Sequence, residues 1–317
     1  MKVSDQVSIG GLELKNRIVM PPMNTELAAL DGSVTDELVE HYVARAPPLG
    51  MVIVEHSYVR LDGKLSPRQP GIHVDGNLEG FSRLAKAIRE TGTPACIQIN
   101  HAGVKCDAKV TGSTPVGPSP ANGARELGIE EIDGIVDAFR EAAARAASAG
   151  FNAVEVHGSH GFLLCEFTSP LANQRKDGYG GSLENRARLP LEVVGSVRDE
   201  IGPDMQLWYR LGADDRTPGG NTLDDGVRIG RMLASQGVDV LDVSGGMCGS
   251  RPPGVAGPGY FAYAAKAVKE ATGLPVVAVG GITTPAAAQR VLDEWGVDLV
   301  AVGRALLKNP DWGKAIG

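Results

Sequence analysis

The chain has 317 residues, of which 43% are hydrophobic and 22% charged, with a formal net charge of −7. This length suits one large α/β barrel, which typically needs about 250 residues, so we expect a single domain over residues 1–317. The net charge is negative and no long run of like charges occurs, which excludes a basic surface for nucleic acid. No apolar run approaches the roughly 20 residues of a membrane span. Nothing at the N-terminus resembles a secretory signal, which favours a cytoplasmic protein, and the sequence leaves a homo-oligomer open.

The first residues predict a short hairpin. Gly10 and Gly11 stand between apolar flanks in residues 1–14, a pattern typical of two strands joined by a tight turn.

Beyond the hairpin, short β-branched runs follow one another along the chain. Each run is nearly all apolar, as expected for parallel strands buried on both faces. The eight predicted strands are Ile18–Met20, Met51–Glu55, Ala95–Ile99, Ala153–His157, Gln206–Leu211, Val240–Val243, Val276–Gly280 and Leu299–Gly303.

Amphipathic segments separate these strands. The predicted helices are Thr35–Arg45, Asn77–Glu90, Ile129–Ala149, Leu183–Ile201, Leu223–Ser235, Tyr260–Ala271 and Pro285–Glu294. Glycine, which suits a left-handed helix end, follows six of them, at Gly92, Gly150, Gly202, Gly237, Gly273 and Gly296. Eight strands with helical crossovers predict a closed (β/α)₈ barrel. A doubly wound open sheet uses the same alternation, but the strand count and the missing Gly-x-Gly-x-x-Gly after the first strand disfavour it.

In such barrels the chemistry lies just past the carboxyl ends of the strands. Gly280 and Gly281 follow the seventh strand, and Gly303 and Arg304 follow the eighth. Glycine backbone and a guanidinium fork are suited to phosphate, so we expect a phosphate site here. Ordinary glycine turns are the alternative interpretation.

Arg210, His157 and His160 also stand at strand ends. Arg210 either faces an electron-rich cofactor or pairs with Asp214 or Asp215. Two histidines three residues apart can polarise one carbonyl oxygen, and the alternatives are a metal site or two core histidines.

No third ligand stands near the histidine pair at metal-binding spacing, so we expect no metal. None of the four cysteines lies in a Cys-x-x-Cys pair, which disfavours zinc and iron–sulfur sites.

These residues stand within longer motifs. The stretch Val154–Leu164 reads VEVHGSHGFLL, and Ser169–Arg188 reads SPLANQRKDGYGGSLENRAR. Both closely resemble the Old Yellow Enzyme family, as do Lys15–Ile18, Gln98–Gly103 and Asn309–Asp311. The resemblance covers nearly the whole chain, and the Tyr179–Arg188 motif is long and specific.

The resemblance implies an FMN-containing (β/α)₈ barrel that takes hydride from NADH or NADPH. The acceptor would be a small molecule with a conjugated carbonyl, an α,β-unsaturated compound reduced at its C=C bond. The flavin ring would be lined by Pro22, Met23, Asn24, Gln98 and Arg210. The FMN phosphate would lie against Gly280, Gly281, Gly303 and Arg304. His157 and His160 would hold the substrate carbonyl.

The sequence departs from the family pattern in three respects. Phe162 replaces the tyrosine that commonly gives a proton to the substrate α-carbon, which leaves open a flavin enzyme that runs oxidatively or acts on a bulkier acyl or cyclic substrate. Asn24 replaces the cysteine or threonine that tunes the flavin. The cysteines of the iron–sulfur branches are absent from this chain, so it resembles only their catalytic module. A barrel that binds flavin without turnover is a third interpretation, disfavoured because His157 and Arg210 would be expensive to bury without a ligand.

Overall fold

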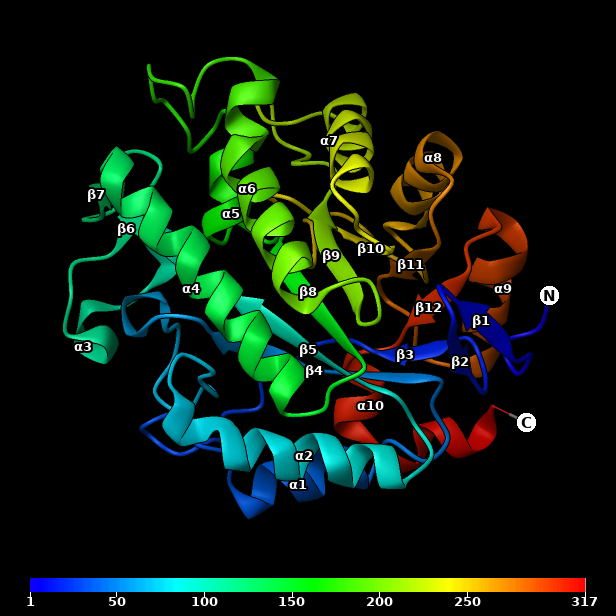
Figure 1. Ribbon diagram of the computed structural model, residues 1–317. Helices are drawn as coiled ribbons and strands as arrows, with labels where there is room; N and C mark the ends of the chain where they lie inside the picture. Colours follow the sequence, from blue (N-terminus) through cyan, green and yellow to red (C-terminus); the bar gives the residue numbers. More distant parts are fainter. Residues whose placement is uncertain (317) are drawn as a thin grey trace.

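The computed structural model describes residues 1–316, and its centre is a closed barrel of eight parallel strands (Figure 1). In barrel order these are β10 (Val240–Ser244), β11 (Val276–Val279), β12 (Leu299–Ala301), β3 (Ile18–Met20), β4 (Met51–Tyr58), β5 (Ala95–Asn100), β8 (Ala153–Gly158) and β9 (Gln206–Gly212). The predicted (β/α)₈ barrel is confirmed, and the open-sheet alternative is wrong because β9 and β10 close the ring.

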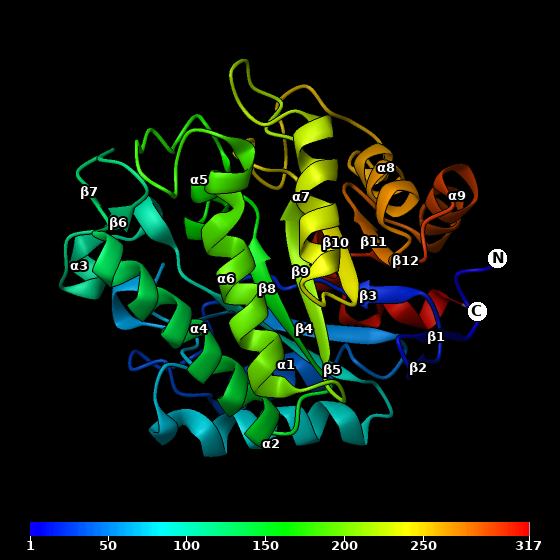
Figure 2. The same ribbon diagram turned by 45° about the horizontal axis from the view of Figure 1, so that its top comes forward.

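Helices surround the barrel, as Figures 1 and 2 show. The long ones are α1 (Asp36–Val43), α2 (Leu78–Glu90), α4 (Ile129–Ser148), α6 (Leu183–Ile201), α7 (Leu223–Ser235), α8 (Ala262–Thr272) and α9 (Pro285–Trp295). Each buries one apolar stripe against the strands. All six predicted helix-ending glycines have positive φ. Gly273 and Gly296 are left-handed helix ends, whereas Gly202 has a ψ of −171° and lies outside that region.

The predicted hairpin is present at the N-terminal end of the barrel, made of β1 (Val7–Ile9) and β2 (Leu12–Leu14). Ile9 and Leu14 pack with interior side chains of the barrel, Trp208 among them. The Gln206 amide accepts a hydrogen bond from the Trp208 indole (2.7 Å) and donates one to the carbonyl of Ile9. The hairpin therefore plugs this end of the barrel, and the opposite end carries the polar residues.

The structure differs from the prediction at the last two strands. β11 ends before Gly280, whose φ of 124° ends the ladder. β12 ends at Ala301, two residues before Gly303. Five short elements lie outside the predicted strands and helices: α3 (Ala108–Thr111), β6 (Val116–Gly117), β7 (Arg125–Glu126), α5 (Leu163–Thr168) and α10 (Arg304–Lys308). They have too few residues for a periodic pattern to indicate them.

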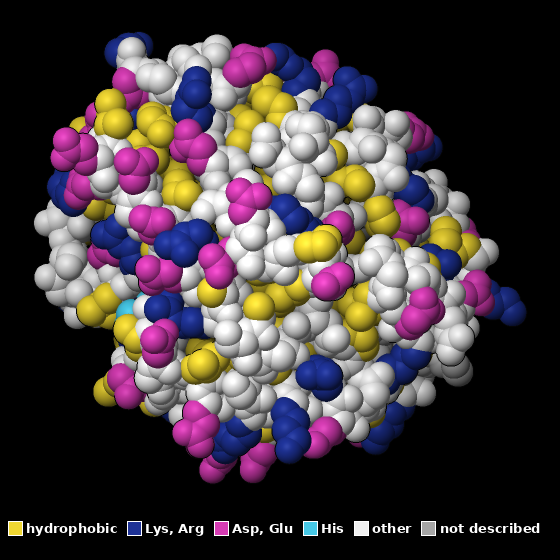
Figure 3. All heavy atoms as spheres, in the orientation of Figure 1, with side chains coloured by type: hydrophobic (Ala, Val, Ile, Leu, Met, Phe, Trp, Pro, Cys, Tyr) yellow, Lys and Arg dark blue, Asp and Glu magenta, His cyan; other side chains and the backbone are white. Residues whose placement is uncertain are grey.

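No helix within residues 1–316 has the length and apolar character needed to cross a membrane. On the face drawn in Figure 3, basic and acidic side chains are interspersed. This face offers no continuous basic patch of the kind that binds nucleic acid.

Candidate active site

One cavity of about 1050 Å³ opens at the carboxyl ends of the strands. It brings together every residue that the sequence singled out for cofactor or substrate. They are Pro22, Met23, Asn24, Gln98, His157, His160, Phe162, Arg210, Gly280, Gly281, Gly303 and Arg304. Their roles stay predictions, but their common location is a property of the fold. The volume suits a cofactor together with a second small ligand.

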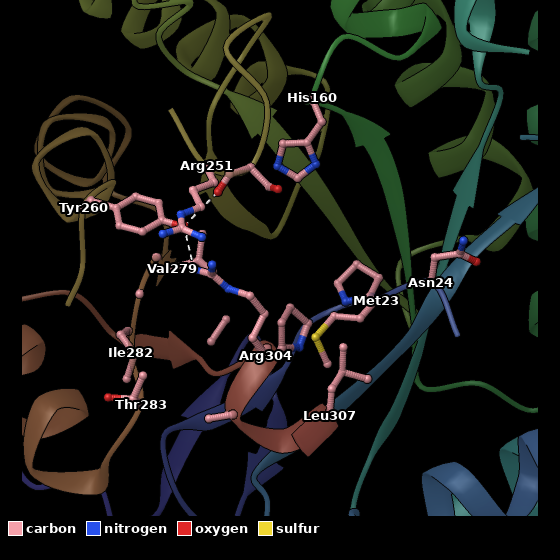
Figure 4. Close-up of a pocket in the computed structure, with 18 of the residues that line it drawn as sticks. Met23, Asn24, His160, Arg251, Tyr260, Val279, Ile282, Thr283, Arg304 and Leu307 are labelled. Carbon is pink, nitrogen blue, oxygen red and sulfur yellow. Dashed lines mark hydrogen bonds between the residues drawn. The ribbon is translucent and has the colours of Figure 1, made fainter. Parts of the chain in front are cut away.

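The charged side chains that line the cavity are all basic. Arg210, Arg251, Arg304 and Lys308 line it, whereas no aspartate or glutamate is among its described lining residues. In Figure 4, Arg251 and Arg304 extend toward each other near Tyr260, whose hydroxyl accepts a hydrogen bond from Arg304 (3.2 Å). Guanidinium groups gathered without a carboxylate favour an anionic ligand. Sequence reasoning missed Arg251 and Tyr260 because they stand in or beside the long link after β10.

Three glycines give this end of the cavity its shape. A Cβ atom added to Gly280 would lie 2.6 Å from the Tyr260 ring, and one on Gly303 would lie 2.8 Å from the Met23 sulfur. At Gly281, which has a φ of 63°, it would lie 2.3 Å from the carbonyl oxygen of Gly257. Only glycine allows the backbone to approach so closely, as a phosphate cradle requires.

The Gly281→Ala variant is therefore expected to bind FMN at least tenfold more weakly, because the loop must move to admit the methyl group. The measurement is fluorescence titration of apoprotein with FMN. Gly296→Ala is the matched control, since Gly296 has nearly the same φ (64°) with nothing within 4 Å of the added Cβ. It should lose about 1–2 kcal/mol of stability with unchanged FMN affinity. Equal FMN affinities of the two variants would contradict the cradle.

A buried polar network lies in the barrel beneath the cavity. Arg210 pairs with Asp242 on the next strand (Nη1 to Oδ2, 3.1 Å), and Gln98 donates to Glu155 (2.7 Å). The predicted alternative, a pair of Arg210 with Asp214 or Asp215, is wrong. The side chain of Arg210 points into the barrel, where Asp242 lies directly across in register.

Burial raises the pKa of both carboxyl groups of this network, and their mutual repulsion raises that of Glu155 further. Arg210 opposes both shifts. Gln98 Oε1 and Arg210 Nε remain buried without a protein partner, although both residues line the cavity. Buried polar groups without a partner that face a cavity are suited to bind a ligand there.

His157 and His160 lie close together, with ring centroids 5.3 Å apart and planes nearly perpendicular. His160 has a φ of 59°, a conformation rare for a non-glycine residue, and its strained turn brings the ring back toward His157. Burial lowers the pKa of both imidazoles well below the usual value, the nearby His160 lowers that of His157 further, and Arg210 adds to both shifts. Both rings are therefore neutral at neutral pH. No group of described residues has the composition of a metal site, so the metal alternative finds no support.

The ring nitrogens of this pair are partly engaged. His157 Nδ1 contacts the hydroxyl of Ser159 (3.3 Å), and His160 Nε2 contacts that of Ser244 (2.7 Å). His157 Nε2 and His160 Nδ1 are left for a ligand. If both serine hydroxyls donate, both remaining nitrogens carry protons and can donate to one oxygen atom.

Phe162 contacts His157 edge to face (centroids 4.9 Å apart) and lines the cavity, as the sequence predicts. The Asn24 amide donates one hydrogen bond to Glu26 (2.8 Å), which leaves its carbonyl oxygen and its second N–H for other partners. His56, at the carboxyl half of β4, also lines the cavity and was missed. Its signal was a histidine directly after the predicted end of a buried strand.

Residues 5–317 match the model of the NADH:flavin oxidoreductase / NADH oxidase family. The chain belongs to this family. An NADH oxidase of Thermoanaerobacter brockii is 41% identical over 96% of the chain, which spans about half (49%) of that protein. An NADPH dehydrogenase of Halalkalibacterium halodurans is 36% identical over 98% of the chain and 92% of its own length.

Solved structures of the family agree with the barrel. A 2-naphthoyl-CoA reductase aligns over 99% of the chain and 51% of its own, with a TM-score of 0.92 and 28% identity. An old yellow enzyme homologue from Zymomonas mobilis aligns over 99% and 92%, with a TM-score of 0.86 and 26% identity. The resemblance to the Old Yellow Enzymes is thereby confirmed.

The family implies FMN as cofactor and a reduced nicotinamide as electron donor. The residues present fit FMN. The orphaned polar atoms of Gln98 and Arg210 suit the ring, and the glycine cradle with Arg304 suits the phosphate.

Proposed function

We propose that this flavin oxidoreductase reduces the activated C=C bond of α,β-unsaturated carbonyl compounds, using NADH or NADPH. The observation that supports this most directly is the pair of neutral imidazoles, His157 and His160, in the same cavity as the residues that we assign to the flavin. When bound, FMN supplies the hydride chemistry, accepting hydride from the nicotinamide and passing it to the alkene.

The protein's residues activate the substrate. His157 Nε2–H and His160 Nδ1–H donate to the carbonyl oxygen, which draws electron density from the β-carbon and stabilises the negative charge that develops on oxygen. Gln98 Oε1 would accept from an N–H of the flavin ring, and the Arg210 cation would stabilise negative charge on that ring. Phe162 packs against His157 and keeps water from that face of the imidazole.

The test is anaerobic flavin absorbance on the purified protein. NADH or NADPH is expected to bleach the band near the visible flavin maximum, and a cyclic enone is expected to restore it. Bleaching without recovery on any enone would overturn the proposed substrate class while leaving the nicotinamide half-reaction in place.

A second candidate function is the same redox chemistry, run reductively or oxidatively, on a bulkier acyl thioester substrate. It is favoured by the surplus of cations, since Arg251 and Lys308 line the cavity in addition to the Arg304 cradle. It is also favoured by the similarity to a 2-naphthoyl-CoA reductase. In the same assay, recovery of absorbance with an aromatic acyl-CoA but not with a cyclic enone would select this candidate.

A further inference from the structure

A third histidine faces the substrate side of the cavity. His56 lies on β4 with its ring centroid 5.6 Å from Phe162 and 6.3 Å from His157. It is buried and lines the cavity, yet among the described residues only Gln69 bonds its ring, at Nδ1. Its Nε2 is therefore the ring atom that remains for a ligand.

Gln69 determines where the proton of this imidazole resides. Gln69 Oε1 accepts from the backbone N–H of Leu65 (2.7 Å), and Gln69 Nε2 donates to the carbonyl oxygen of His56 (2.7 Å). These two backbone groups fix the orientation of the amide. The second N–H of Gln69 then points at His56 Nδ1 (2.7 Å), which must accept. The proton of neutral His56 is consequently on Nε2.

We propose that His56 supplies the proton that the missing hydroxyl at Phe162 cannot, delivering it from Nε2 to the α-carbon of the substrate. This inference rests on the proposed function. Once the hydride of the proposed reaction has formed the β-carbon–hydrogen bond, the C=C electron pair resides on an enolate. That enolate forms the α-carbon–hydrogen bond by taking the Nε2 proton, and the imidazolate left behind regains a proton from water, releasing hydroxide.

The surroundings of His56 suit this role. Burial lowers its pKa to about 4, so at neutral pH the ring is the neutral Nε2–H form, and neutral imidazoles of this kind do act as electrophiles in enzymes. The hydrogen bond that Nδ1 accepts from Gln69 withdraws electron density and makes Nε2–H more acidic.

Other acids of the region are engaged elsewhere. Tyr260, the one tyrosine among the described lining residues, donates its hydroxyl to the carbonyl of Ser250 (2.9 Å) near Arg251 and Arg304. Lys105 lies over the Phe162 ring, 5.0 Å from its centroid, but donates to the backbone of His160 and is not among the lining residues.

The test compares the two half-reactions by anaerobic stopped-flow. In His56→Gln, reoxidation by 2-cyclohexenone should slow about 100-fold or more, because a general acid contributes 10²–10⁴-fold. Reduction by NAD(P)H should be unchanged. Adding Phe162→Tyr to His56→Gln should restore most of the lost rate, which a merely structural defect would not permit. The control His73→Gln, whose ring stacks on Tyr58 outside the cavity, should behave as wild type.

A readout independent of turnover is ¹⁵N NMR of histidine-labelled protein, where His56 should show a bare Nδ1 and a protonated Nε2 at pH 7. A protonated Nδ1, wild-type reoxidation in His56→Gln, or a loss that Phe162→Tyr does not restore would each overturn the inference. Wild-type protein that no enone reoxidises would overturn the proposed function itself, and the inference with it. Failure of the proposed function is seen in the wild-type protein, whereas failure of the inference about His56 is seen only in the variants, so the two results can be distinguished.

Discussion

The Arg210→Met variant is expected to lower the free energy of unfolding by about 3–5 kcal/mol, because it leaves Asp242 buried without its cation. Arg210 and Asp242 lie almost wholly inside the barrel, where water cannot replace the lost partner. The same substitution removes a cation from the cavity, so FMN should be largely lost during purification. Urea denaturation followed by circular dichroism gives the stability, and absorbance gives the flavin content.

Two further variants distinguish the loss of the buried ion pair from a general effect of the substitution on packing. Arg210→Met with Asp242→Leu should recover much of the stability, since a dry apolar pair replaces the stranded charge. Arg228→Met breaks a pair with Glu184 in which both side chains are more than half exposed, and it should change stability by less than about 1 kcal/mol. A loss for Arg210→Met no larger than that of Arg228→Met would contradict the buried-pair argument.

The His157→Ala variant is expected to slow reoxidation by a cyclic enone about 10²–10³-fold, the usual loss when one donor to a developing oxyanion is removed. FMN should remain bound, because the residues proposed to bind the flavin are untouched, and reduction by NAD(P)H should change far less than reoxidation. Stopped-flow absorbance of the two half-reactions measures this separation.

His41→Ala serves as the matched control, since His41 is a partly buried histidine on α1 that does not line the cavity. It should leave both half-reactions unchanged. Enone reoxidation at the wild-type rate in His157→Ala would remove the carbonyl-binding role from the pair, and loss of FMN would show that His157 serves the cofactor instead.

The sequence predicts the strands well because each is a short apolar run bounded by polar residues. It also places the site, since parallel strands all end at the same rim. The sequence does not show which residues of neighbouring strands lie opposite each other. Arg210 and Asp242 each stand two residues before the end of their strand, and they pair directly across β9 and β10. Asp214 is closer in sequence but lies beyond the strand, where it accepts a hydrogen bond from Tyr263.

The His56–Gln69 contact was beyond sequence reasoning for a different reason. The two residues are 13 positions apart, joined by a loop whose path depends on tertiary contacts such as the Tyr58–Gly71 bridge. No periodic pattern encodes such a contact. The sequence does show a histidine at the end of a buried strand. That pattern indicates that His56 lies near the site, but it does not indicate what His56 does there.

The plug at the base of the barrel also bears on how the chain is made. The Ile9 carbonyl bonds to Gln206, 197 positions later, and the backbone N–H of Val3 bonds to Gln289, 286 positions later. A ribosome adds about 5–20 residues per second, so roughly 10–40 s pass between the synthesis of the hairpin and that of Gln206. During that wait Ile9 and Leu14 are exposed apolar side chains on a two-stranded ribbon too small to be stable alone. The hairpin is thus synthesised long before the residues that hold it in place, and the burial of its apolar side chains depends on them.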